Sequence, residues 1–128
     1  MEQKNNPLSP HLQIYRWQIS SLLSITHRIV GIINILAITM ICFWSLFLLF
    51  GSESYEIVNN FFKSFFGKFI AVGLCWTFSF HILNELRHLF WDLGYGFDLK
   101  ISKITGVSAL IGSFALTILF YLIGKNIF

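Results

Sequence analysis

Two histidines lie seven residues apart in the second half of the chain. His81 and His88 share one face of a helix, because seven residues make close to two turns. Neutral imidazole binds haem iron and other metals, and histidines facing the interior of a helical bundle can hold such a cofactor. The alternative is that His81 only forms a hydrogen bond between helices, and that His88 lies near lipid headgroups, where a polar residue is ordinary. The spacing alone leaves both interpretations open.

A second polar group precedes the first long apolar segment, where Ser24, His27 and Arg28 occur within five residues. Ser24 and Arg28 are four residues apart and therefore share a helical face. A hydroxyl and a guanidinium in that position can hydrogen-bond a carbonyl or carboxylate at the membrane edge, because arginine keeps its charge and presents several donors. The alternative is an arginine that only anchors the helix among the headgroups. The sequence contains neither the HExxH metal motif nor the CxxCH motif of covalent haem attachment.

The elements that must position these residues are membrane-spanning helices. Of the 128 residues 55% are hydrophobic and 12% charged, and the mean hydropathy is +0.70. A soluble domain has about 25% charged residues, and a spanning helix needs about 20 apolar ones. Residues 29–50 and 104–124 contain no charge, and 69–84 form a shorter uncharged run with apolar neighbours. The sequence predicts an all-α membrane protein with one domain over 1–128 and helices at approximately 24–50, 64–91 and 104–126. No separate soluble catalytic domain fits.

The segments between these helices are predicted to be polar or interfacial. Residues 1–23 form an interfacial arm without the features of a cleavable signal peptide, 51–60 an outer loop, 61–66 an aromatic run, and 92–103 an inner loop. In the third helix, Ala109, Ser113 and Thr117 recur at four-residue spacing, which favours close packing against another helix.

Basic residues are divided unequally between the two sides of the membrane that three spans define. Six fall on the side of the amino terminus, namely Lys4, Arg16, Arg28, Arg87, Lys100 and Lys103. Three fall on the other side, namely Lys63, Lys68 and Lys125. The positive-inside rule then predicts an amino terminus in the cytoplasm or matrix. The net charge of +3 indicates contact with anionic lipid and not with nucleic acid, because no basic face remains once the helices are buried.

Three blocks of sequence resemble one family. Residues 7–15 resemble a PLSPHLxIY arm, residues 24–31 a SIxHRxTG motif and residues 81–94 an HxxxGxRHLxWDxG motif. They occur in the same order around three spans in the cytochrome b subunit of succinate dehydrogenase, the larger membrane anchor of respiratory complex II. The resemblance covers essentially the whole chain.

The resemblance implies roles for individual residues. His81 matches an axial ligand of a b-type haem, and the second axial histidine belongs to a partner anchor subunit. The motifs place His27, Arg28 and His88 near the haem propionates, and Ser24 and Arg28 in the ubiquinone pocket.

It also implies an assembly in a bacterial cytoplasmic or mitochondrial inner membrane. Together with the second anchor subunit, the chain would form half of a haem-binding helical bundle. A flavoprotein subunit and an iron–sulfur subunit would deliver electrons from succinate, so that the chain itself would not oxidise succinate.

Two positions depart from the family pattern. Glu85 replaces a glycine between the two histidines, and can reach towards the headgroups, pair with Arg87, or hydrogen-bond one of the histidines. Val30 replaces a threonine or serine, which we expect to have little consequence. The alternatives are a haem-free anchor of the same complex, a fumarate reductase anchor, and a non-redox scaffold or transporter subunit in which Arg28, His81 and Glu85 form a polar pathway.

Overall fold

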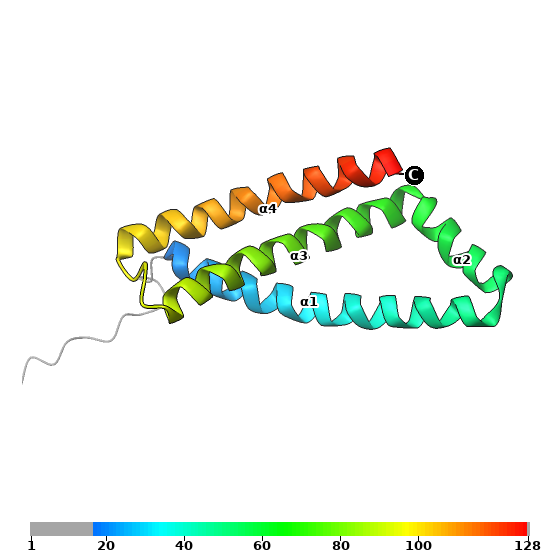
Figure 1. The fold of residues 1–128 in the computed structure, drawn as a ribbon, viewed down its shortest axis with the longest axis horizontal. Coiled ribbons are helices and arrows are strands. Elements are labelled where there is room, and N and C mark those ends of the chain that lie inside the picture. The colour runs from blue at the N-terminus through cyan, green and yellow to red at the C-terminus, as the bar shows by residue number, and fades with distance from the viewer. Residues whose placement is uncertain (1–16, 128) are drawn as a thin grey trace, which may run out of the picture.

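Three long helices form the body of the molecule in the computed structural model, which describes residues 17–127 (Figure 1). They are α1 (Ile19–Phe47), α3 (Phe65–Asp92) and α4 (Leu99–Ile127). Each is long and apolar enough to cross a membrane, which confirms the three predicted spans. A helix of 29 residues such as α1 extends about 43 Å, more than the roughly 30 Å of the hydrocarbon core. Most of the predicted interfacial arm, residues 1–16, lies outside the described residues.

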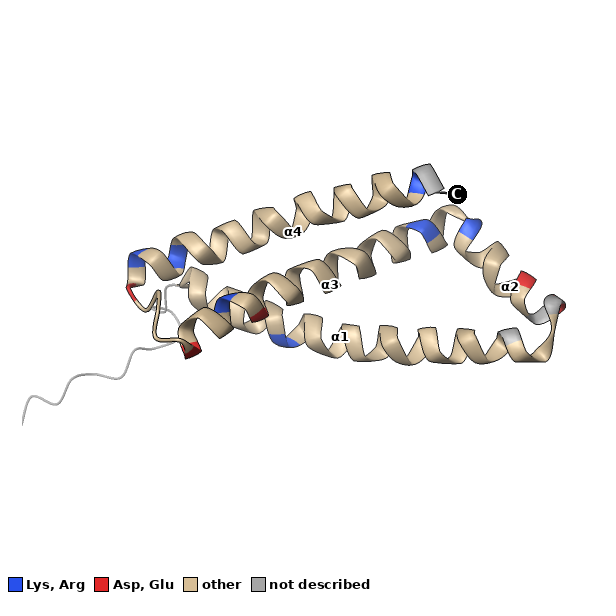
Figure 2. Ribbon diagram, in the orientation of Figure 1, with Lys and Arg blue, Asp and Glu red and all other residues tan. Residues whose placement is uncertain are grey.

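Two helices begin earlier than predicted. Helix α1 starts at Ile19 instead of residue 24, and α4 starts at Leu99 instead of residue 104, so that it includes Lys100 and Lys103. Residues 19–23, which the prediction assigned to the arm, carry no charge, whereas the prediction for α4 stopped where Lys103 ends the uncharged run. A helix continues beyond that point because long basic side chains reach the headgroups while their backbone stays helical. Figure 2 shows charged residues towards the ends of the long helices and uncharged stretches between them.

The predicted outer loop and aromatic run are largely a helix, α2 (Ser52–Lys63), which follows the short 3₁₀ turn η1 (Leu48–Phe50). The prediction of a loop was wrong because Tyr55, Val58 and Phe62 recur at spacings of three and four and give α2 one apolar face. This face lies towards Trp44 of α1, whose ring centroid is 6.1 Å from that of Tyr55. Figure 1 shows α2 running between the ends of α1 and α3 where these two helices diverge.

The core is small, and much of it is polar. Its buried apolar residues are Leu23, Val30, Ala37, Phe80 and Ala109, of which Leu23, Val30 and Phe80 form one contacting cluster. Many large apolar side chains are exposed on the outside of the bundle, as expected where lipid is the solvent. Helix α4 lies along α3 in Figure 1, and the predicted packing stripe is confirmed: three small side chains of α4 are buried, namely Ala109, Ser113 and Thr117.

Candidate functional site

Three imidazole rings come together near the end of the bundle where α1 begins and α3 ends. His27 on α1 stacks on His81 of α3, with ring centroids 4.5 Å apart. The centroid of His88 is 5.5 Å from that of His27. Gly31 of α1 lies opposite the His81 ring, where a Cβ would be 3.5 Å from His81 Cε1, an ordinary van der Waals distance. The structure therefore gathers all three histidines that the sequence had assigned to the haem region.

Glu85 contacts this histidine cluster, defined here as His27, His81 and His88. Its Oε1 lies 3.1 Å from His27 Nε2 and 3.9 Å from His81 Nε2. Glu85 stands where the family has a glycine, and a contact with histidine and an ion pair with Arg87 were both open. The structure supports the contact with histidine. About half of the Glu85 side chain is exposed.

Two residues of the histidine cluster, together with Glu85, have the donor atoms of a metal site. His27, His81 and Glu85 each offer one ligand atom, and these atoms lie within 4.8 Å of one another. His81 Nδ1 is buried and has no hydrogen-bond partner among the described residues. A buried polar atom inside a membrane is normally paired, so an unpaired imidazole nitrogen is consistent with a partner beyond the described residues.

A polar pocket of about 600 Å³ adjoins the cluster. We call it the inner polar pocket, and it is lined by Gln18, Ser20, Ser21, Ser24, Asn84, Arg87, His88 and Trp91. Ser24 lines this pocket as the sequence suggested. Arg28, which shares a helical face with Ser24 in the prediction, is exposed and does not line the pocket.

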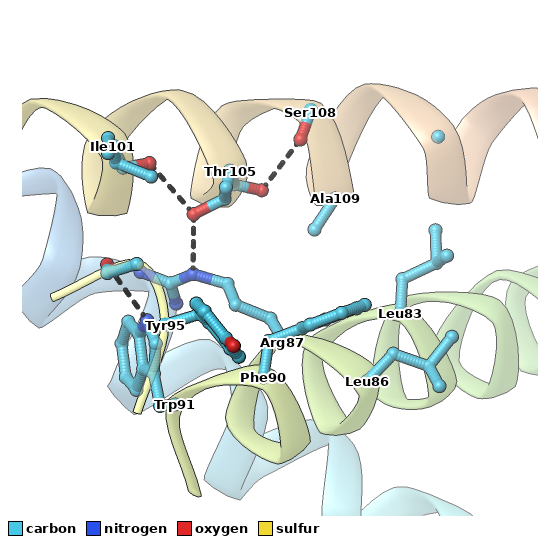
Figure 3. A pocket seen from close by; sticks show the side chains of 12 residues that line it. Leu83, Leu86, Arg87, Phe90, Trp91, Tyr95, Ile101, Thr105, Ser108 and Ala109 are labelled. Carbon is cyan, nitrogen blue, oxygen red and sulfur yellow. Dashed lines mark hydrogen bonds between the residues drawn. The ribbon is translucent and has the colours of Figure 1, made fainter. Parts of the chain in front are cut away.

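The guanidinium that lines this pocket belongs to Arg87, which sequence reasoning considered only as a partner for Glu85. Arg87 is buried and donates hydrogen bonds across to α4 and to Asn84. Figure 3 shows its side chain extending from α3 towards Thr105, beside Trp91. The available signal was the spacing of Arg87 and Trp91, which are four residues apart and thus neighbours on the helix surface.

Asn84 links Arg87 to the histidine cluster. Its Oδ1 accepts from Arg87 Nη1 at 3.4 Å, and its Nδ2 lies 3.4 Å from His88 Nε2. An amide nitrogen is a donor only, so this contact assigns His88 Nε2 as the acceptor. The chain Arg87–Asn84–His88 thus fixes the orientation of the His88 ring at the edge of the pocket.

Comparison with known proteins agrees with this geometry. Residues 2–120 match the family described as succinate dehydrogenase/fumarate reductase transmembrane subunit. The chain is 36% identical over 115 residues to the succinate dehydrogenase cytochrome b556 subunit of Rickettsia felis, covering 90% of each chain. It is 33% identical to the cytochrome b556 subunit of Paracoccus denitrificans, covering 90% of this chain and 88% of the relative. The cytochrome b560 subunit of Reclinomonas americana is 36% identical over 127 residues, covering 93% of this chain and 86% of the relative.

These matches extend over all three spans and over the histidine cluster. The chain therefore belongs to the succinate dehydrogenase/fumarate reductase transmembrane subunits, as a cytochrome b subunit of succinate dehydrogenase that anchors this oxidoreductase complex in the membrane.

Proposed function

We propose that this chain binds a b-type haem jointly with a second anchor subunit and helps to form the ubiquinone-reduction site of succinate dehydrogenase. The observation on which the proposal depends is the histidine cluster, with an unpaired buried nitrogen on His81. The relatives' names, cytochrome b556 and b560 subunits, give independent support.

The residues present fit a haem. His81 supplies an imidazole with an unpaired ring nitrogen, and the small Gly31 lies opposite that ring. His81 would bind the haem iron, and the partner subunit would provide a further ligand. His27, Arg28 and His88 would lie towards the propionates, for which cationic and N–H groups are suitable partners. When bound, such a haem stores one electron at a time.

The inner polar pocket is the proposed site of quinone reduction. A quinone oxygen becomes more basic as electrons arrive, and hydrogen-bond donors aimed at it stabilise the developing charge. Ser24 offers a hydroxyl that lines the pocket, and Arg28 lies one turn further along α1. We assign both residues to this site.

The orientation follows from the charge distribution of the sequence. The side with more basic residues would be the cytoplasmic or matrix side, and it contains the amino terminus and the loop between α3 and α4. The inner polar pocket lies at that end, where the iron–sulfur and flavoprotein subunits would dock and deliver electrons from succinate. In this arrangement the chain anchors the assembly and supplies no residue to succinate oxidation.

The test is the dithionite-reduced minus oxidised spectrum of the detergent-solubilised complex, with subunits identified by mass spectrometry. We expect a b-type band in the unsubstituted complex and its loss in His81→Ala with all subunits retained. Thr39→Ala is the control, because Thr39 is exposed on α1 and bonds only to its own helix. An unchanged band in His81→Ala would refute the assignment of His81.

A haem-free anchor of the same complex is the second candidate, and the contact of Glu85 with two imidazoles favours it. The same spectrum distinguishes the two. A complex that contains the same subunits and reduces ubiquinone without a b-type band would establish the haem-free anchor.

A further inference from the structure

Arg87 is a buried permanent cation whose hydrogen-bond partners are all neutral. It is 8% exposed. Its Nε donates to Thr105 Oγ1 at 3.1 Å, and its Nη2 donates to both the backbone oxygen and the Oγ of Ser102 at 2.9 Å (Figure 3 shows the first of these). Its Nη1 donates to Asn84 Oδ1 at 3.4 Å. The guanidinium carbon lies 4.2 Å from the ring centroid of Trp91.

No carboxylate of the described residues balances this charge. The two contacts of Glu85 in the ion-pair range are with histidines, and Asp92 and Asp98 are exposed and form no ion pair with Arg87. Ser102 lies in the first turn of α4, where the helix dipole is positive and opposes a neighbouring cation. A buried charge without a counter-charge is unfavourable, and arginine cannot become neutral to avoid this. The geometry therefore calls for an anion from beyond the described residues.

The inner polar pocket provides the space for such an anion. Arg87 lines this pocket together with Ser24 and His88. A guanidinium has five N–H donors, and the contacts given above use four of them. One N–H of Nη1 remains available.

We propose that Arg87 provides the positive charge that pairs with an anionic oxygen of a ligand bound in the inner polar pocket. This inference rests on the proposed function, which offers two sources of that oxygen. One is a haem propionate. The other is an oxygen of ubiquinone that has received electrons from the iron–sulfur subunit and has not yet taken up its proton from water. Ser24 would then share the pocket with a second binding residue, on α3.

Two substitutions test the charge in different ways. Arg87→Gln removes the cation. Asn84→Asp keeps the size of the side chain and places a carboxylate next to Nη1, so that Arg87 is neutralised from within the chain. Thr105→Val is the matched control, because it removes one bond between α3 and α4, leaves the cation, and alters a residue that does not line the inner polar pocket.

The measurements are made on the purified complex. They are kcat and KM for ubiquinone-1 with succinate as donor, the haem content, and the midpoint potential of the haem. A hydrogen bond to a charged group is strong enough that both test variants should change quinone affinity by about tenfold or more if quinone is the ligand. Thr105→Val should change neither the KM nor the potential.

The outcomes separate the two ligands from a purely structural role. A raised KM at unchanged haem potential identifies quinone as the partner of Arg87. A lowered haem potential at unchanged KM identifies a propionate, because loss of a nearby positive charge favours the oxidised haem. If neither quantity changes in Arg87→Gln and Asn84→Asp, or if Thr105→Val causes the same change, Arg87 only ties α3 to α4 and the proposal is overturned. Failure of the proposed function would appear earlier, in the unsubstituted complex, as the absence of haem and of quinone reduction.

Discussion

Replacing Glu85 by glycine is expected to raise the haem affinity of the complex by about fivefold and no more. The Glu85 carboxylate lies 3.1 Å from His27 Nε2, where two unit charges would interact by about 5 kcal/mol at an effective dielectric of about 20. The side chain is 55% exposed, however, and measured pairs with such exposure contribute only about 0.2–1 kcal/mol. The smaller energy, measured for exposed pairs, applies here because Glu85 is seven residues before the end of α3. This is a distance of about 10 Å along the helix, so the carboxylate is within reach of headgroup water.

This magnitude predicts that Glu85 weakens haem binding without preventing it. Since about 1.4 kcal/mol corresponds to a factor of ten, a contact of about 1 kcal/mol changes an equilibrium constant about fivefold. The assay is titration of haem into the complex purified from haem-deficient cells, followed by the Soret absorbance, for the unsubstituted complex, Glu85→Gly and Glu85→Gln. Glu85→Gln separates charge from size. A rise in affinity of a hundredfold or more would show that the carboxylate blocks the site, and a loss of haem in Glu85→Gly would show that it supports the site; either result refutes the reasoning.

Two further predictions concern packing of the helices away from the site. Gly67→Ala should destabilise the protein by about 1–3 kcal/mol, because the added Cβ would collide with the backbone of Phe61. Gly73→Ala is the control: its Cβ would meet no other atom within 4 Å, so it should stabilise the protein by about 0.5–1 kcal/mol. Equal midpoints of thermal denaturation in detergent for the two variants would contradict this prediction. Asn34→Leu should stabilise the protein by about 1 kcal/mol. The substitution removes only one long hydrogen bond, from Asn34 Nδ2 to the Thr77 backbone oxygen, and it also removes a buried Oδ1 that has no partner among the described residues. A loss of about 2 kcal/mol or more in the same denaturation assay would mean that this oxygen has a partner in the complex.

The three spans could be predicted from the sequence because hydrophobicity over about 20 residues is a strong signal and lipid leaves few alternatives to a helix. Helix α2 could not be predicted in the same way. Its 12 residues include Glu53, Glu56, Asn59 and Asn60, so its average composition is that of a polar loop. Its helical character depends on a narrow apolar face that contacts Trp44, and this contact exists only once α1 and α3 are placed.

The candidate site also contains some features that could be predicted from the sequence and others that could not. The shared face of His81 and His88 follows from their spacing along one helix. The stacking of His27 on His81 cannot be predicted from spacing, because these two residues are 54 positions apart in the sequence. Their contact depends on how α1 packs against α3. The burial of Arg87 was missed for the same reason, since its partners Ser102 and Thr105 belong to another helix.

The partial exposure of His81 in the histidine cluster gives a physical reason for the proposed assembly with a second anchor subunit. Lipid tails are as apolar as leucine, so the many exposed apolar side chains of this chain provide no hydrophobic force between helices. By contrast, His81 is only partly buried, and a polar group facing hydrocarbon is unfavourable. A second subunit that covers this face relieves that cost and, in the proposed function, supplies the other haem ligand. We therefore expect the face around His27, His81 and Glu85, and not the larger apolar surface, to be where the second anchor subunit binds.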